Sequence, residues 1–226
     1  MNLDKNKRKY CNLIHLKSDP MVSNLLETET SIVLYKRDME CYFIACEMMS
    51  EVDQILAVID TSKNNGFCIN TKELRPYLPG MEDAFECWNY LYEKDSIDFE
   101  VRDDVEIREL DDSYYDFVLE HYHGYDDPNY IQSRLASGNL WGVFKEDVCM
   151  GFIGYHDEGS MGLLVILDQY KRLGLGTYME KYLIDKTLKQ GRLPFAQVHP
   201  DNVASKNLQE KLGLKEDQNI VTWGNG

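Results

Sequence analysis

The chain has 226 residues, of which 39 are acidic and 24 are basic, so its formal net charge is −15 at pH 7. This balance argues against bulk nucleic-acid binding, which needs a basic surface, and it fits either a cationic small-molecule substrate or simple solubility. The composition is 43% hydrophobic, as in ordinary globular proteins. The apolar run at residues 163–167 falls far short of the roughly 20 residues of a membrane helix, so we expect no membrane partner.

The cysteine pattern and the N-terminus indicate a cytoplasmic protein. None of the six cysteines forms a Cys-x-x-Cys pair, which argues against a zinc ribbon or a thioredoxin-like site. No apolar run follows the basic N-terminal segment, as a secretory signal would require. His121 and His123 have no further ligands at metal spacing, so we expect no metal site.

The first half of the chain predicts a mixture of helices and strands. We expect a basic helix over residues 4–27 and a hairpin over residues 31–47. Apolar residues at helical spacing predict a helix after residue 50, and a strand is expected over residues 84–92.

The chain becomes acidic and loses its periodicity around residues 95–104, and we place a domain boundary there, between residues 1–102 and 103–226. The second half predicts, in chain order, a strand at 105–110, a helix at 112–122, a short helix to 138, a hairpin at 140–156, a strand at 161–167, a helix at 176–190, a strand at 194–198, a helix at 202–212 and a strand at 219–224.

The hairpins of the two halves resemble each other. Residues 35–44 (YKRDMECYFI) align without a gap with residues 144–153 (FKEDVCMGFI). Two interpretations remain open, because hairpins share a simple alternation: an ancient duplication that left the first half as scaffold or substrate wall, or a chance likeness.

The stretch KRLGLGT, Lys171 to Thr177, joins a predicted strand to a predicted helix. Glycines allow the backbone to approach a ligand closely, and the first N–H groups of a helix favour an anion. The stretch lacks the Lys-Ser/Thr ending of a P-loop, and Met179 stands where a dinucleotide fingerprint needs glycine. It predicts either a phosphate or diphosphate site or a structural glycine turn beside two solvated bases.

The order of elements, together with this stretch, resembles the GNAT superfamily of acyl-CoA N-acyltransferases, whose diphosphate loop reads Q/R-x-x-G-x-G/A. Here Lys171 takes the Q/R position. A second similarity is DNVASKNLQEKLGL, in which Asn202 can cap a helix and Gly213 can end it, although Leu214 replaces the family's aromatic residue. The resemblance covers residues 104–226 and is nearest to the glycine N-acyltransferase-like branch.

The resemblance implies an α/β GNAT fold: a mixed, mostly antiparallel sheet with helices on both faces, preceded by a smaller degenerate GNAT-like half. It implies an acetyltransferase that uses acetyl-CoA, or another short acyl-CoA, as its co-substrate. The residues that it assigns to acyl-CoA binding are Leu164, Val165, Ile166, Leu167, Lys171, Arg172, Leu173, Gly174, Leu175, Gly176, Thr177, Asn202 and Ser205.

In the family, an amine attacks the thioester directly, and a glutamate often serves as the base. The equivalent position here is Ser160, and Glu158, two residues earlier, would share its face on a continuous strand. Glu158 is the first candidate for the base, and His156 and His199 follow. Gln209 replaces the tyrosine that often serves as the general acid, so either water or Tyr178 would protonate the thiolate.

The polar, aromatic loop after residue 120 is expected to form the acceptor wall. Tyr122, His123, Tyr125 and Tyr130 would bind a small amine or an amino-acid-like acceptor, and Asp126 or Asp127 would hold its cation. The alternative is that these residues serve only ordinary loop packing. The residues carry no signal for an oligomeric state.

Two rival interpretations remain. The missing tyrosine and the shifted glutamate are compatible with a catalytically weak acyl-CoA-binding sensor. A protein that binds no CoA and uses its glycines only for a turn is the other rival.

Overall fold

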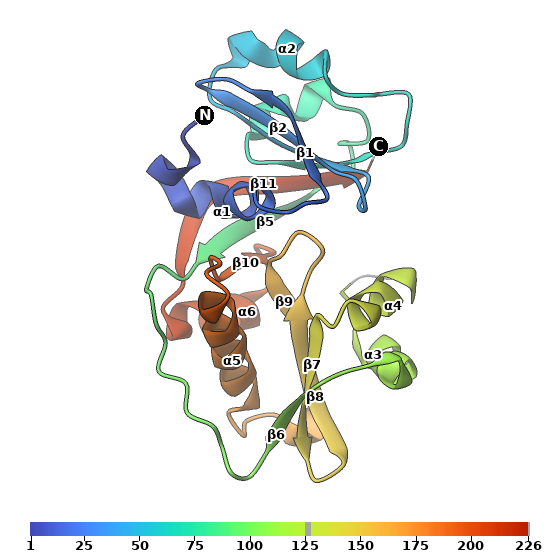
Figure 1. Ribbon diagram of the computed structural model, residues 1–226, viewed down its shortest axis with the longest axis vertical. Coiled ribbons are helices and arrows are strands. Elements are labelled where there is room, and N and C mark those ends of the chain that lie inside the picture. The colour runs from blue at the N-terminus through green and yellow to red at the C-terminus, as the bar shows by residue number, and fades with distance from the viewer. Residues whose placement is uncertain (125–127, 226) are drawn as a thin grey trace. The chain divides into compact units, whose positions relative to one another are not determined.

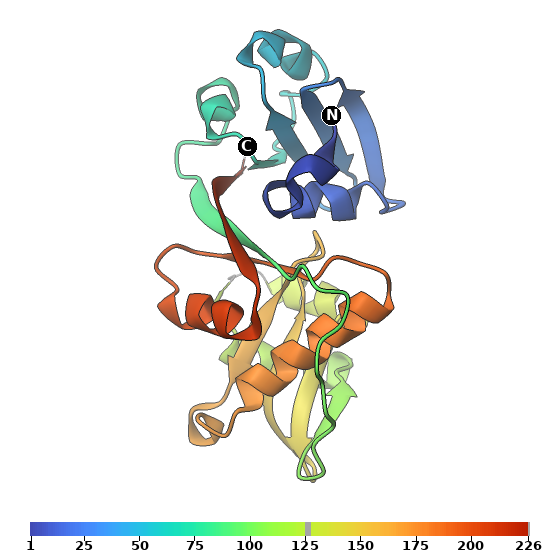
Figure 2. The same cartoon turned by 90° about the vertical axis from the view of Figure 1, so that its left-hand side faces the viewer.

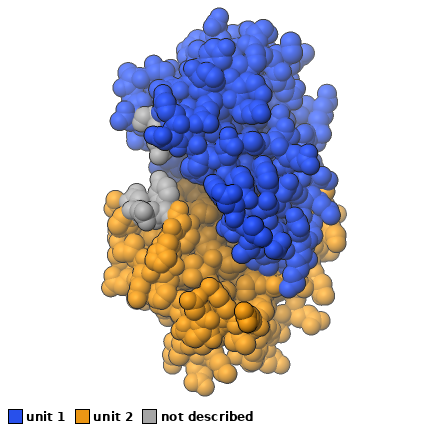
Figure 3. Space-filling view, turned by 180° about the vertical axis from the view of Figure 1, so that it is seen from behind, with its two compact units in different colours: residues 1–91, 197–226 blue, residues 92–196 orange. Residues whose placement is uncertain are grey.

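The computed structural model describes residues 1–124 and 128–225, and it divides into two compact units (Figure 3). One unit combines Met1–Leu91 with Gln197–Gly226, and the other is Tyr92–Ala196. Among the described residues, no helix is both long and apolar enough to cross a membrane.

The first unit contains a six-stranded part of the sheet in the order β1-β2-β3-β4-β11-β5 (Figure 1). β3 and β4 are parallel, and the other neighbouring pairs are antiparallel. Its elements are η1 (Leu3–Asn6), α1 (Lys7–Leu16), β1 (Val22–Glu27), β2 (Ser31–Lys36), β3 (Cys41–Cys46), η2 (Met49–Glu51), α2 (Val52–Leu56), β4 (Gly66–Ile69), η3 (Lys72–Tyr77), β5 (Phe85–Leu91), α6 (Val203–Leu212) and β11 (Lys215–Asn225).

The predicted helix over residues 4–27 is wrong in its second half. α1 ends at Leu16, and residues 22–27 form strand β1, which pairs with β2. Pro20 explains the break, because proline lacks the N–H that a continuing helix would need.

The second unit has the order β9-β8-β7-β6, with antiparallel neighbours throughout. Helix α5 covers one face of these strands, and α3 and α4 cover the other (Figure 1). The elements are β6 (Glu106–Glu109), η4 (Asp112–Tyr114), α3 (Tyr115–His121), α4 (Pro128–Ala136), β7 (Leu140–Lys145), β8 (Val148–Tyr155), β9 (Met161–Ile166), η5 (Asp168–Tyr170), α5 (Leu175–Lys189) and β10 (Phe195–Val198), whose last two residues belong to the first unit. The expected α/β class, with a mixed, mostly antiparallel sheet, is confirmed.

The order of elements repeats along the chain. The series α1-β1-β2-β3-α2-β4-η3-β5 matches the series α4-β7-β8-β9-α5-β10-α6-β11, and in both the fourth strand runs parallel to the third. This favours a duplication. However, it equates the β2–β3 hairpin with β8–β9, so the gap-free alignment of residues 35–44 with residues 144–153 matched hairpins that are not equivalent.

The last strand of the chain completes the first unit. β11 lies between β4 and β5 and pairs antiparallel with both. Residues 197–225 therefore belong with residues 1–91, and the compact units do not follow the expected division between residues 102 and 103. A strand with neighbours on both edges has its main-chain groups satisfied there, which holds it in the middle of the sheet.

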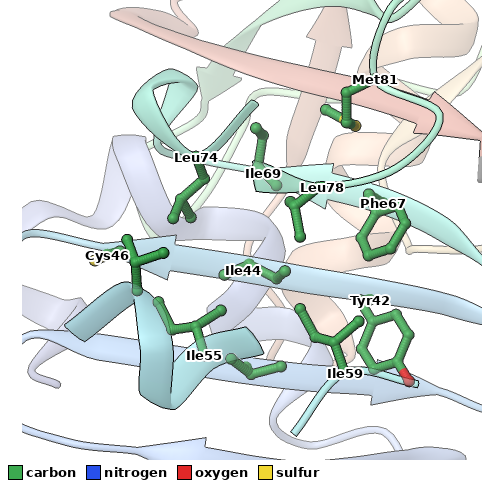
Figure 4. Packing of buried hydrophobic residues seen from close by; sticks show 12 residues of the cluster. Tyr42, Ile44, Cys46, Ile55, Ile59, Phe67, Ile69, Leu74, Leu78 and Met81 are labelled. Carbon is green, nitrogen blue, oxygen red and sulfur yellow. The ribbon is translucent and has the colours of Figure 1, made fainter. Parts of the chain in front are cut away.

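Apolar clusters cover both faces of the first unit's sheet. On one face, Ile44 and Phe67 pack with Ile55 of α2 and with Leu74 and Leu78 (Figure 4). The opposite cluster contains Ile32, Leu34 and Phe43 of the sheet, together with Leu13 and Leu16 of α1. The alternation of Ile32, Val33 and Leu34 between the two clusters is the pleat of a strand buried on both faces.

Two buried asparagines fasten α1 to this sheet. The side-chain amide of Asn12 donates to Asn70 Oδ1 at 3.2 Å, and that of Asn70 donates to Asn12 Oδ1 at 3.1 Å. Asn70 also donates to the Lys9 carbonyl at 2.7 Å. Each residue is at most 3% exposed, so the loss of one amide leaves the others buried without their partner.

We therefore expect Asn70→Ala to lower the free energy of unfolding by about 1–3 kcal/mol, because it orphans buried polar groups. Urea unfolding of the whole chain would measure the loss. Asn64→Ala is the matched control, since Asn64 is exposed. Equal midpoints for the two variants would contradict a stabilising role for the amide pair.

Candidate functional site

The junction between β9 and α5 leaves a helix start without a side-chain cap. Gly174 is the N-cap residue, with φ +77°, and the first helical hydrogen bond runs from the Tyr178 N–H to the Gly174 carbonyl at 3.0 Å. The N–H groups of Leu175 and Gly176 precede that bond, so the helix offers them no acceptor. With the positive end of the helix dipole, they favour an anion.

The two glycines of the junction serve different purposes. Gly174 has a left-handed backbone, in which a side chain would be strained, although a Cβ would meet nothing nearer than Arg102 Nη1 at 4.0 Å. A Cβ on Gly176 would make ordinary contacts of 3.9 Å with Leu164 and Ile166 of β9. Gly174 is therefore required by the conformation of the turn, and Gly176 lies where the helix start faces the strand.

The charged residues of the junction are exposed. Lys171 Nζ lies 2.6 Å from Asp168 Oδ1, and this hydrogen bond lowers the pKa of Asp168. Arg172 has a left-handed backbone, with φ +65°. The sequence did not reveal the pairing with Asp168, which offsets part of the positive charge of Lys171.

The outer edge of β9 carries the main-chain groups of Leu164 and Ile166. The Leu167 N–H donates to the Met150 carbonyl at 3.0 Å, so it faces β8. Because main-chain groups alternate between the two edges of a strand, those of Ile166 face the other edge. Within the described second unit, β9 meets β10 only where Met161 lies opposite Ala196. Of the four residues expected to pair with acyl-CoA, Leu164 and Ile166 have their main-chain groups on the outer edge. The main-chain groups of Val165 and Leu167 face β8.

A bulge shapes that edge. Phe152 pairs with Val165, and Gly154 pairs with Gly162. One residue of β8 lies between these pairs but two residues of β9, so β9 carries one extra residue. Leu163 has φ +51°, a conformation that costs a non-glycine residue roughly 1–2 kcal/mol. Its buried side chain packs in the core against α3 and α4, which offsets that cost. Bulges bend strands and often lie next to active sites.

The predicted catalytic residues lie together in the turn between β8 and β9. The Ser160 hydroxyl donates to Glu158 Oε1, and both side chains are buried. The expectation that a continuous strand places them on one face is wrong, because β8 ends at Tyr155 and β9 begins at Met161. Instead, Gly159 has φ +90° and its N–H donates to the His156 carbonyl at 2.9 Å, and this turn brings the two side chains together.

His156 and two tyrosines join this group. The Tyr130 hydroxyl bonds to His156 Nδ1. Burial, followed by the negative charge of Glu158, raises the pKa of Tyr122 to about 12 and raises that of Tyr130 as well. Burial lowers the pKa of His156. Both tyrosines therefore keep their protons at pH 7 while His156 is neutral, and Tyr130 donates to it.

Gly162 makes room for the imidazole, because a Cβ at that position would collide with His156 Nε2. Arg134 is a further member that the sequence analysis missed: it is buried and forms an ion pair with Asp157. Its place beside Ile131 and Leu135 on α4 resembles an ordinary helix pattern, so only the tertiary structure reveals the pair.

The other predicted residues lie apart from this group or outside the described chain. His123 is exposed, and Tyr125, Asp126 and Asp127 lie outside the described residues. Asn202 caps α6 as expected, since its Oδ1 accepts from the Ser205 N–H at 3.0 Å, and Gly213 ends that helix with φ +91°. Asn202, Ser205, His199 and Gln209 belong to the first unit, and their functional roles stay predictions.

Arg102 is a residue beside the junction that the sequence did not reveal. Its Nη1 donates to the Leu173 carbonyl at 3.1 Å. The two residues are 71 positions apart, and Arg102 falls in the acidic stretch that indicated a domain boundary.

The lowered pKa of His156 predicts a pH-dependent stability. Burial favours the neutral imidazole in the folded state. The contribution of His156 to the free energy of unfolding is therefore fully present above the unfolded-state pKa of about 6.5, and it is lost as the pH falls through the lower pKa of the folded state. In urea unfolding at pH 5–8, His156→Gln should reduce the loss of unfolding free energy at the acid end. His123→Gln is the control, because His123 is exposed. An unchanged pH dependence of the unfolding free energy in His156→Gln would contradict the lowered pKa of His156.

Comparisons with known proteins identify the fold. A family model described as FR47-like protein matches residues 143–223. No curated protein is significantly similar in sequence. A Drosophila protein of known structure has a TM-score of 0.67 at 17% identity, over 86% of this chain and 73% of its own.

Two further structures carry descriptions of function. A GCN5-related N-acetyltransferase from Kribbella flavida has a TM-score of 0.58 at 14% identity, over 96% of this chain and 93% of its own. A tandem GNAT protein from the clavulanic acid biosynthesis pathway has a TM-score of 0.51 at 10% identity, over 100% of this chain and 95% of its own. The chain therefore has the GNAT fold, in an architecture of two related halves.

Proposed function

We propose that this protein transfers an acetyl group, or another short acyl group, from acyl-CoA to a primary amine. The observation that carries the proposal is the left-handed Gly174, which leaves the start of α5 without a side-chain cap beside the outer edge of β9. The motif similarity to the glycine N-acyltransferase-like branch favours a small, amino-acid-like acceptor.

The main chain of the second unit supplies the acyl-CoA site. The amides from Arg172 to Thr177 would hold the diphosphate, and the outer edge at Leu164 and Ile166 would pair with the pantetheine arm. The bound donor supplies an activated thioester. The Ile166 N–H, which faces the outer edge, would polarise the thioester carbonyl and stabilise the developing oxyanion.

The amine must lose a proton before it can attack. With a pKa of about 10.4, roughly one alkylamine in a thousand is neutral at pH 7. Glu158 would accept this proton, directly or through water, because its buried carboxylate lies among proton-bearing tyrosines and a neutral histidine. The neutral amine nitrogen then bonds to the carbonyl carbon and gives up its second proton to water, the carbon–sulfur bond breaks, and the thiolate leaves.

Water is our assignment for protonating the thiolate. The alternative donor, Tyr178, turns its hydroxyl toward the Arg102 N–H at 3.4 Å and stacks its ring on Phe99. The Tyr178 ring therefore packs against the residues before β6, and its hydroxyl accepts a hydrogen bond there.

The direct test is release of free thiol from acetyl-CoA in the presence of a panel of primary amines. We expect release that depends on both reactants and increases with pH. Tight CoA binding without thiol release across the panel would indicate a sensor. An unchanged melting temperature with acetyl-CoA would contradict the proposal, because ligand at 100 times its dissociation constant should add about 2.7 kcal/mol.

Gly174→Glu should abolish acetyl-CoA binding, since it adds a strained side chain and a negative charge at the diphosphate seat. Gly191→Glu is a matched control: Gly191 follows the other end of α5, is exposed and has φ +70°, and a Cβ there meets nothing within 4 Å. Calorimetric titration would compare the two. Equal affinity in both variants would remove this turn from the binding site.

Glu158→Gln should lower kcat by about a hundredfold and leave the affinity for acetyl-CoA unchanged, because the amide keeps an acceptor for Ser160 but cannot take a proton. The exposed Glu146→Gln serves as the control. If Glu158→Gln keeps the full kcat and His156→Gln loses it, His156 and not Glu158 is the base.

A further inference from the structure

The segment between β5 and β6 lies along helix α5 (Figure 2). Lys181 Nζ donates to the Asp98 carbonyl at 2.8 Å. Phe99 stacks on Tyr178, with ring centroids 5.4 Å apart, and meets the edge of Tyr182 at 5.9 Å. These contacts fix an otherwise irregular part of the chain against the first two turns of the helix.

Arg102 extends this contact to the turn before the helix. Its Nη1 donates to the Leu173 carbonyl at 3.1 Å, and its guanidinium carbon lies 5.6 Å from the centre of the Tyr178 ring. Its Nε and Nη2 donate to the two carboxylate oxygens of Asp104 at 2.9 and 2.6 Å. One planar guanidinium therefore bridges a carboxylate and a main-chain carbonyl.

We propose that Arg102 is a positioning residue for acyl-CoA binding, which holds the Leu173–Gly174 peptide in the orientation that the diphosphate needs. This inference rests on the proposed function. The carbonyl of Leu173 and the N–H of Gly174 belong to one trans peptide and point in opposite directions. By holding the carbonyl, Arg102 directs the Gly174 N–H away from itself and fixes the peptide that opens the left-handed turn.

Asp104 determines how Arg102 acts. The carboxylate neutralises most of the guanidinium charge at a distance, so the contribution of Arg102 is one of geometry more than of net charge. A lysine at this position would keep the positive charge, but it has no planar fork with which to hold both the carboxylate and the carbonyl. The substitution Arg102→Lys therefore distinguishes a positioning role from simple electrostatic attraction of the anion.

The experiment measures the dissociation constant of acetyl-CoA, and kcat/KM with two donors, for Arg102→Gln and Arg102→Lys. The donors are acetyl-CoA and acetyl-pantetheine, which has the same thioester but no diphosphate. Arg108→Gln is the matched control, because Arg108 also pairs with a nearby carboxylate, Glu106, in the same unit.

We expect both Arg102 variants to bind acetyl-CoA about tenfold more weakly than the wild type and the control, a loss of about 1.4 kcal/mol. Their kcat/KM with acetyl-pantetheine should equal that of the control, which a general loss of structure would not permit.

Three results would overturn the inference. Wild-type affinity in Arg102→Lys would show that only charge matters, and control-like affinity in Arg102→Gln would show no role at all. Equal losses with both donors would show a general structural effect. If the wild type itself binds no acetyl-CoA, the proposed function fails first, so the two failures are distinguishable.

Discussion

The candidate site depends on two residues with left-handed backbone conformations, Leu163 and Gly174. At Leu163 the bulge gives β9 an extra residue, and beyond Met161 the strand has no ladder with β10 among the described residues of its unit. At Gly174 the helix begins without a side-chain cap. Both features leave main-chain groups that secondary structure does not satisfy, and such groups require other partners. This requirement makes the junction suitable for a ligand that carries both amides and phosphates.

The rest of the second unit holds these two positions in place. The Leu163 side chain is buried in the cluster beneath α3 and α4, so the core stabilises an unfavourable backbone conformation. On the other face, Gly176 in the first turn of α5 lies against Leu164 and Ile166, and the segment before β6 packs along the helix through Phe99. The geometry of the junction is therefore set by apolar packing on both faces of a sheet, while its anion-binding groups come from the main chain.

Local signals predicted much of this arrangement. Alternation and glycine spacing predicted the hairpins and the β9–α5 junction, and Asn202 and Gly213 predicted the ends of α6, because each depends on a few neighbouring residues. Long-range contacts were not predictable. The bond from Arg102 to Leu173 joins residues that lie far apart in sequence, and the insertion of β11 between β4 and β5 depends on the whole sheet. The placement of Glu158 beside Ser160 was expected only for a continuous strand, because a period of two does not reveal a left-handed Gly159.

The net charge of −15 shows why the binding of an anion has to be a local property. Acidic side chains scattered over the surface repel phosphates, but at physiological ionic strength their effect decays over about 8 Å. Within that range of the junction, Lys171 is offset by Asp168 and Arg102 by Asp104, so paired cations add little net charge. What remains is the exposed Arg172 and the positive end of α5, whose amides cannot be neutralised by titration. An acidic protein can therefore bind a diphosphate without a basic patch, provided that its backbone keeps those amides pointed at the ligand.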